Sequence, residues 1–206
     1  TAQNTRGVSA IHPIPAEFVK QQIDDCLSDI GADAIKTGML HSAPVIEAIA
    51  EALKPYSDIP LILDPVMVAK GGAALLEPEA ITALKERLMP LATLVTPNIP
   101  EAEMLASTLI SGTEGMINAG TRILKNTGCA AVLIKGGHLP GGTLTDILVT
   151  ENDTIPFTSA RVPSKNTHGT GCTLASAIAT YLAQGTPLPF AIEKARAYVA
   201  KAIEHA

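Results

Sequence analysis

The sequence contains no tryptophan, and its aromatic share is only 3%. Any core must therefore be built from aliphatic side chains, which suits helices packed on a buried parallel sheet. Charged residues make up only 17% of the chain and hydrophobic residues 47%, so the composition excludes a disordered or fibrous protein. With 206 residues, the chain fits one domain with a single substantial core.

Cysteine is scarce as well, because Cys26, Cys129 and Cys172 lie far apart and form no CxxC pair. This spacing argues against a disulfide framework or a structural zinc site and favours a reducing compartment. Long hydrophobic runs are missing, since the apolar stretch 172–183 is too short to span a bilayer. No secretory signal is visible. We therefore expect a cytoplasmic protein without a membrane partner.

Positive charge is not concentrated anywhere along the chain. The net charge is −5, and no cluster or stripe of Lys and Arg stands out. Binding to nucleic acid depends on such a basic patch, so the sequence argues against a nucleic-acid partner.

Helix-like and strand-like patterns alternate along the chain, which predicts βα units around a mainly parallel sheet. Between residues 144 and 162 the pattern changes to short alternating segments with turn residues, which indicates an antiparallel edge. The predicted fold is thus a single α/β domain over residues 1–206. The expected helices are 15–31, 42–53, 78–88, 101–107, 113–126, 169–184 and 188–205, and the expected strands are 33–37, 60–64, 93–96 and 130–135.

Polar motifs follow four of the predicted strands. In open α/β sheets, ligands bind beyond the carboxyl ends of the strands. Each motif alone is compatible with ordinary turn chemistry. Their shared position nevertheless favours one crevice over four unrelated turns. The motifs are Lys36-Thr-Gly-Met39, Asp64-Pro-Val-Met67, Thr96-Pro-Asn98 and Lys135-Gly-Gly-His138.

The segment Asn166-Thr-His-Gly-Thr-Gly-Cys-Thr173 leads directly into an apolar helix. The glycines allow backbone N–H groups to turn toward one point, and a helix start adds partial positive charge. Gly169, Thr170 and Gly171 are therefore candidates for an anion hole. The segment is not a Walker A motif, since it lacks the lysine and the spacing. A glycine-rich helix start with a buried cysteine explains the pattern equally well.

Cys172 falls in the first turn of that predicted helix. The helix dipole there is expected to favour the thiolate, which can accept a proton from an attacking hydroxyl group. Cys26 lies on the apolar face of its predicted helix, and Cys129 adjoins a buried strand. We expect both to be inert packing residues.

Phosphoryl transfer also requires a metal ion and cations around the phosphates. Asn98 and Glu101, three residues apart at a strand-to-helix junction, are candidates to hold Mg²⁺ through its water shell. Asp64 can add a further carboxylate, and Lys135 can reach a phosphate oxygen. The alternatives are that Glu101 merely complements a helix dipole and that Lys135 is a solvated lysine.

Taken together, these motifs resemble the hydroxymethylpyrimidine/phosphomethylpyrimidine kinases, which are vitamin kinases of ribokinase-like fold. The Gln3-Asn-Thr-Arg-Gly7 segment, the four strand-end motifs and the final glycine-rich segment occur in the family's order along nearly the whole chain. The last motif carries Cys172 where the sugar kinases of this fold carry Asp. The family's leading strand and its C-terminal tail would lie outside residues 1–206.

The resemblance implies a three-layer fold and two successive ATP-dependent phosphorylations in thiamine biosynthesis. The substrates would be 4-amino-5-hydroxymethyl-2-methylpyrimidine and then its monophosphate. Gln3 would bind the aminopyrimidine, and Met39 and Val66 would line its pocket. The resemblance also implies a possible homodimer.

The site residues are carried over from the matching motifs. Mg-ATP would be held by Asn98, Glu101 and Lys135, with Asp64 and Glu101 nearest to the metal. Cys172 would deprotonate the nucleophile beside the anion hole. Two other functions are compatible with the sequence: a pyridoxal/pyridoxine kinase, and a catalytically silent pyrimidine-binding or regulatory domain on the same scaffold.

Overall fold

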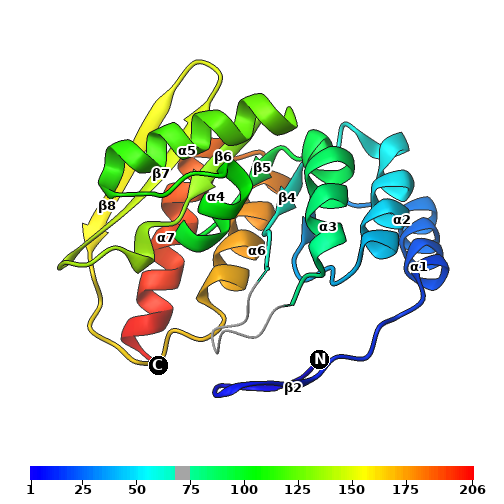
Figure 1. Cartoon of the computed structure of the whole chain (residues 1–206), viewed down its shortest axis with the longest axis horizontal. Coiled ribbons are helices and arrows are strands. Elements are labelled where there is room, and N and C mark those ends of the chain that lie inside the picture. Colours follow the sequence, from blue (N-terminus) through cyan, green and yellow to red (C-terminus); the bar gives the residue numbers. More distant parts are fainter. Residues whose placement is uncertain (68–74) are drawn as a thin grey trace.

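The computed structural model describes residues 1–67 and 75–206, and a six-stranded sheet lies at its centre (Figure 1). The strands follow the order β3-β4-β5-β6-β7-β8. The first four are parallel, and β7 and β8 are antiparallel to their neighbours, which confirms the predicted antiparallel edge. The bounds are β3 (Ile35–Thr37), β4 (Leu61–Leu63), β5 (Leu94–Val95), β6 (Ala131–Ile134), β7 (Thr143–Thr150) and β8 (Thr154–Ala160).

The sheet separates two hydrophobic cores. Successive side chains of a strand point to opposite faces. Leu61 and Leu63 of β4 therefore join one core while Ile62 joins the other, and Ile147 and Leu148 of β7 divide in the same way. Burial on both faces explains why these strands read as continuous apolar runs.

Helices cover both faces, which confirms the three-layer prediction. The last two helices cover one face (Figure 1) and the remaining ones pack against the other core. Their bounds are α1 (Ala16–Asp29), α2 (Ala43–Leu53), α3 (Pro78–Ala83), α4 (Ile99–Ala106), α5 (Gly112–Thr127), α6 (Thr170–Ala183) and α7 (Leu188–Glu204), with single-turn helices η1 (Lys54–Tyr56), η2 (Leu84–Leu88), η3 (Met89–Leu91) and η4 (Gly136–His138). The predicted helix 78–88 is thus α3 continued by a π-helical turn, η2.

Helix α1 lies at the margin of its layer, against α2. Val19, Ile23 and Leu27 are only partly buried against the core, while Phe18 is 55% exposed. The prediction that Cys26 packs inside was wrong, since this residue is exposed. A helix at the margin of its layer buries only the stripe of residues that faces its neighbour, so residues beside this stripe stay exposed. Cys129 is buried, as predicted.

The first residues form a hairpin that the sequence did not predict. Strands β1 (Ala2–Asn4) and β2 (Gly7–Ala10) pair with each other and lie apart from the three layers (Figure 1). The Asn4 side chain holds the turn, because its Oδ1 accepts the Arg6 N–H at 2.8 Å and the Gly7 N–H at 3.2 Å. Both strands are short and largely exposed, so they lack the alternation of apolar and polar residues by which a strand is predicted from sequence.

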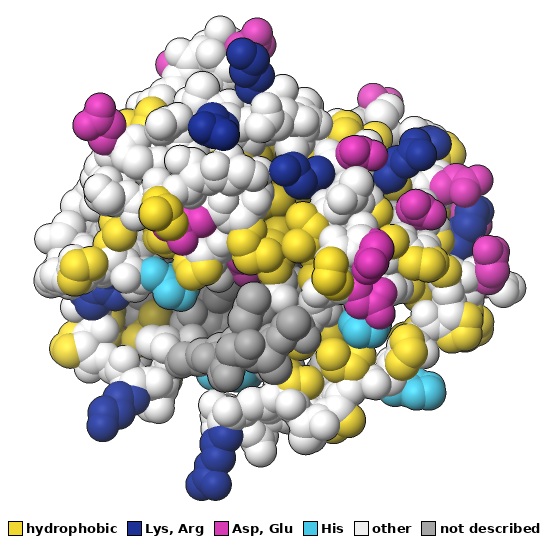
Figure 2. Space-filling view, in the orientation of Figure 1, with side chains coloured by type: hydrophobic (Ala, Val, Ile, Leu, Met, Phe, Trp, Pro, Cys, Tyr) yellow, Lys and Arg dark blue, Asp and Glu magenta, His cyan; other side chains and the backbone are white. Residues whose placement is uncertain are grey.

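One face of the surface shows how the charged side chains are distributed. On the face in Figure 2, Lys and Arg side chains are interspersed with Asp and Glu. Within residues 1–67 and 75–206, no helix has both the length and the apolarity needed to cross a membrane.

The close approach of α5 to β7 yields a stability prediction. A Cβ on Gly120 would lie 2.6 Å from Val149 Cγ2. Alanine gains about 1 kcal/mol over glycine in an exposed helix interior, but overpacking a core costs about 1–3 kcal/mol. We expect Gly120→Ala to lower the free energy of unfolding, measured by urea denaturation. Val149→Ala should cost less in the Gly120→Ala background than alone. A more stable Gly120→Ala protein would contradict this packing.

Candidate active site

Three strand ends meet at the carboxylate of Asp64. Asp64 follows β4 and is only 2% exposed. Its Oδ1 accepts a hydrogen bond from Lys135 Nζ at 2.8 Å and another from Thr96 Oγ1 at 3.1 Å. Thr96 follows β5 and Lys135 follows β6. Three of the four predicted motifs therefore converge, because the carboxyl ends of parallel strands share one edge.

The start of α6 lies against this ion pair. A Cβ built on Gly171 would stand 3.3 Å from Lys135 Nζ and 3.9 Å from Asp64 Oδ2. Glycine thus keeps the helix backbone close to the lysine and the carboxylate. Any larger residue at this position would occupy the space between the helix and the pair.

The local backbone exposes amide groups at the same place. Gly169, the N-cap, has a φ of 79°, a left-handed conformation that favours glycine. The Thr173 N–H bonds to Gly169 O at 2.9 Å. The N–H groups of Thr170, Gly171 and Cys172 come earlier, so they have no acceptor within the helix. Thr170 and Gly171 belong to the candidate anion hole, and free amides at a helix start with a lysine nearby are groups that proteins commonly use to bind phosphate.

Cys172 is exposed. The alternative explanation of this motif was a glycine-rich helix start with a buried cysteine. The glycine-rich helix start is present, but the prediction of a buried cysteine is wrong. The residue directly follows Gly171, so the thiol belongs to the same first turn as the candidate anion hole.

Asn98 and Glu101 form a reciprocal cap at the start of α4. The Asn98 N–H donates to Glu101 Oε2 at 2.8 Å, and the Glu101 N–H donates to Asn98 Oδ1 at 3.0 Å. The structural role considered for Glu101 is thus present, in the form of a capping box. This does not exclude ligand binding, since a carboxylate has further acceptor positions.

Glu101 is also an unusual carboxyl group, because it is only 4% exposed. Burial raises its pKa to about 7, and the negative charge of Asp64 acts in the same direction. The positive charge of Lys135 and the N–H groups of Asn98 and Met67 oppose this rise. A cation beside Glu101 would offset the cost of its burial.

The donor set fits Mg²⁺. Asp64 and Glu101 supply hard carboxylate oxygens, and Mg²⁺ in kinase sites usually takes one or two carboxylates, keeping water and phosphate as its other ligands. Among the residues that the structure describes, no group of three or more His, Cys, Asp or Glu side chains is placed to hold a metal without such help.

The predicted substrate residues are less closely grouped. Met39 and Val66 are half-buried and follow β3 and β4, so they lie at the same sheet edge as Asp64. Gln3 lies on the exposed strand β1 of the hairpin. Binding of the pyrimidine by these three residues stays a prediction.

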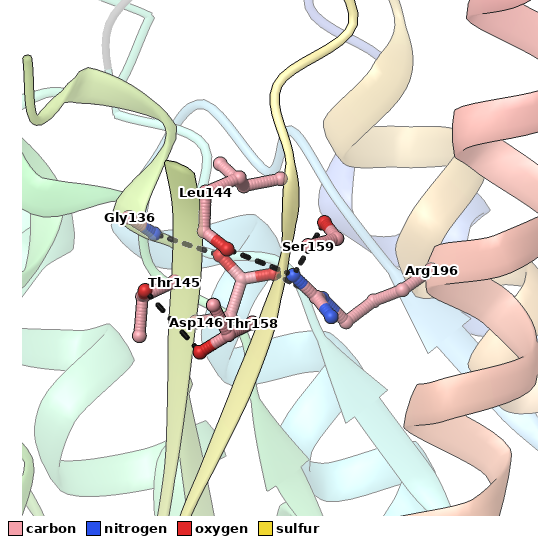
Figure 3. Close-up of polar contacts among 7 residues, drawn as sticks. All are labelled: Gly136, Leu144, Thr145, Asp146, Thr158, Ser159 and Arg196. Carbon is pink, nitrogen blue, oxygen red and sulfur yellow. Dashed lines mark hydrogen bonds and ion pairs between the residues drawn. The ribbon is translucent and has the colours of Figure 1, made fainter. Parts of the chain in front are cut away.

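Sequence reasoning missed a buried ion pair behind the lysine. Asp146, on β7, is 4% exposed. Its Oδ1 accepts the Gly136 N–H at 2.8 Å, and its Oδ2 accepts Arg196 Nε at 2.8 Å (Figure 3). The available signal was an acidic residue directly before the apolar run Ile147-Leu-Val149, where a buried carboxylate requires a partner.

A second arginine holds the turn after Lys135 from the outside. Arg161 donates to the carbonyl oxygens of Gly137, Leu139 and Gly141 at 2.9, 2.7 and 2.9 Å. Burial and the charges of Lys135 and Arg161 lower the pKa of His138.

Two solved structures with the same architecture are kinases. A phosphomethylpyrimidine kinase from Clostridium difficile matches 98% of this chain and 82% of its own, with a TM-score of 0.84 and 40% identity. The pyridoxal kinase of Bacillus subtilis, solved as an ADP complex, matches 98% of this chain and 76% of its own, with a TM-score of 0.89 and 34% identity. The fold is therefore that of the ribokinase-like vitamin kinases, as predicted.

Within this class, the chain belongs to the phosphomethylpyrimidine kinase family, whose model matches residues 1–206. A hydroxymethylpyrimidine/phosphomethylpyrimidine kinase from Rhizobium meliloti is 44% identical over 206 residues, 100% of this chain and 77% of that protein. The thiamine biosynthesis bifunctional protein ThiED of Geobacter sulfurreducens is 57% identical over 203 residues, 98% of this chain. The chain spans only 41% of that bifunctional protein.

The raised pKa of Glu101 predicts a pH-dependent stability effect. The native state holds its proton up to about pH 7, whereas the value without the fold is 4.5. Between these two values the unfolded chain loses the Glu101 proton while the native state keeps it, so the free energy of unfolding falls as the pH rises through this window. Glu101→Gln keeps an oxygen for the Asn98 N–H and removes the charge. Its stability relative to wild type should rise between these pH values, by at most about 3 kcal/mol at about 1.4 kcal/mol per pKa unit.

The measurement is urea denaturation from pH 4.5 to 8 without added metal. Glu114→Gln, which removes an exposed first-turn acid of α5, serves as the control for the loss of a helix-start charge. Parallel curves for wild type and Glu101→Gln across the window would refute the assignment.

Proposed function

We propose that this chain transfers the γ-phosphoryl group of ATP to 4-amino-5-hydroxymethyl-2-methylpyrimidine, and then a second one to the monophosphate. The names of its relatives support both steps, since the Rhizobium relative is named as a kinase of the hydroxymethylpyrimidine and of its phosphate. The observation that carries the proposal is the placement of Lys135 and Asp64 against Gly171. This arrangement joins a cation, a carboxylate and a helix start at one point.

In this proposal the start of α6 receives the moving phosphoryl group. The N–H groups of Gly169, Thr170 and Gly171 face developing negative charge without needing to reorganise, which is the largest usual contribution of an enzyme site. Lys135 binds a phosphate oxygen from the opposite side. Cys172, in the same helical turn, takes the proton of the attacking hydroxyl group.

Mg-ATP is assigned to the neighbouring strand ends. Asp64 and Glu101 would hold Mg²⁺, with Asn98 and Lys135 completing the nucleotide site. Bound Mg²⁺ neutralises charge on the phosphates during transfer. A solved relative supports use of ATP: the pyridoxal kinase of Staphylococcus aureus in complex with AMP-PCP has a TM-score of 0.85 and 35% identity.

On the acceptor side, Gln3 would recognise the aminopyrimidine, since an amide both donates and accepts hydrogen bonds. Met39 and Val66 would provide apolar contacts to the ring. A cytoplasmic location and a homodimer accompany the proposal, based on composition and resemblance.

A pyridoxal kinase is the second candidate, because the pyridoxal kinase of Bacillus subtilis shares the fold with a TM-score of 0.89. The deciding experiment measures ATP consumption by the intact gene product with each vitamin precursor. We expect turnover of the hydroxymethylpyrimidine and of its monophosphate. Turnover of pyridoxal without the second pyrimidine step would favour the alternative, and no turnover of either would favour a silent binding domain.

Replacing the candidate base predicts a specific kinetic loss. We expect Cys172→Ala to lower kcat by about 10²–10⁴, the usual contribution of general acid–base catalysis. Affinity for ATP should change little, because the anion hole consists of backbone groups. Cys26→Ala, which removes another exposed thiol, should retain wild-type kcat. Wild-type kcat in Cys172→Ala would remove this residue from the mechanism.

A further inference from the structure

We infer that the buried pair of Asp146 and Arg196 positions Lys135 relative to the start of α6, and so sets the geometry of the phosphate site. The inference rests on the proposed function in one respect, since it takes Lys135 to bind phosphate. Asp146 and Arg196 act through the backbone next to Lys135, so they are positioning residues.

The first link runs from Asp146 to the lysine turn. Lys135 is fixed on one side by its own N–H, which donates to Pro97 O at 2.9 Å. The next N–H, that of Gly136, donates to Asp146 Oδ1 at 2.8 Å. Because the carboxylate is charged and buried, this hydrogen bond is stronger than one between neutral groups.

Gly136 brings the turn into close contact with β7. A Cβ on this residue would lie 1.9 Å from Thr145 O, which is closer than any two such atoms approach. The backbone of the turn is therefore in direct contact with β7. Asp146 is the residue after Thr145, so steric contact and hydrogen bonding fix the turn at the same place.

The second link runs from Asp146 to α7. Arg196 Nε donates to Asp146 Oδ2 at 2.8 Å (Figure 3). Its Nη2 donates to Leu144 O at 3.4 Å and Ser159 Oγ at 3.3 Å, and its guanidinium lies over the Phe157 ring at 5.9 Å. The side chain is thus held in one orientation by β7 and β8.

The third link joins α7 to the anion hole. Ala191, Ile192 and Ala195 of α7 are buried in the same core as Leu174 and Ala175 of α6. Helix α6 begins at the candidate anion hole. The Asp146–Arg196 pair therefore joins α7, which packs against the helix that carries the candidate amides, to the turn that follows Lys135.

An ordinary structural ion pair is the competing explanation. Buried ion pairs often stabilise no more than well-packed apolar side chains do, because desolvation offsets the attraction. Stability alone therefore does not account for the pair. What an apolar replacement would lack is an acceptor for the Gly136 N–H and a directional connection between α7 and β7.

The test uses the conservative variants Asp146→Asn and Arg196→Lys together with Asp146→Ala. Asparagine keeps an oxygen for the Gly136 N–H, whereas alanine does not. A displacement of about 1 Å at a reacting group can cost about 10²-fold in rate. We expect kcat/KM for ATP to fall about 10²-fold in Asp146→Ala and clearly less in Asp146→Asn and Arg196→Lys. KM for the pyrimidine should stay near the wild-type value in all three.

Ile123→Val is the matched control, since it removes a methylene group from the opposite core at a fully buried position. It lowers stability without touching the turn, so kcat/KM for ATP should not change. Loss of thermal stability in the Asp146 and Arg196 variants with unchanged kcat/KM for ATP would overturn the inference and leave a structural ion pair.

A double-mutant cycle with Lys135→Ala tests whether Asp146 acts through the lysine. If it does, adding Asp146→Ala to Lys135→Ala lowers kcat/KM for ATP little further, because the affected contact is already gone. Multiplicative losses would overturn the inference. The wild type separates this from failure of the proposed function: an intact protein that neither binds Mg-ATP, measured by calorimetry, nor phosphorylates the pyrimidine refutes the function itself.

Discussion

The contact between Lys135 and Asp64 is the constraint on which the candidate site depends. Nζ and Oδ1 lie 2.8 Å apart in a largely dry environment, where two opposite charges attract strongly and either one alone would be costly. The pair fixes the ends of β4 and β6 relative to each other. It also keeps a positive charge directly beside the glycine at the start of α6. Glu101 shares this field, so its ionisation depends on the same two charges.

Most of the architecture could be predicted from the sequence because a few hydrophobic patterns determine it. Continuous apolar runs such as Pro60-Leu-Ile-Leu-Asp64 predicted strands buried on both faces, and the strands are so buried. The hairpin at residues 2–10 was missed, since its short exposed strands are held by one asparagine side chain rather than by a hydrophobic face. Packing of Cys26 was predicted from helical spacing alone, which does not reveal how far a neighbouring helix extends over the apolar stripe.

In the candidate site, the residues with a recognisable local sequence context could be predicted, whereas a residue defined by a partner far away in the sequence could not. Asp64, Glu101, Lys135 and Gly171 were identifiable because each stands at a strand end or a helix start. Arg196 was not, since nothing near it in the sequence indicates that it reaches Asp146, fifty positions earlier. From sequence alone, a charged residue within an amphipathic helix is interpreted as a solvated side chain. Only the folded structure shows that it has a buried partner. Positioning residues are therefore the part of a site that sequence patterns reveal least.

The two-sided packing of β4 has a consequence for how this chain tolerates change. Leu61 and Leu63 serve one core and Ile62 the other, and Asp64 follows at once. Exchanging one aliphatic residue for another here alters only volume. Inserting or deleting a single residue would reverse every side chain to the wrong face and carry the carboxylate away from its lysine. The length of this segment is thus under stricter constraint than its composition. Related chains should differ in the identity of these aliphatic residues but not in the number of residues in the segment.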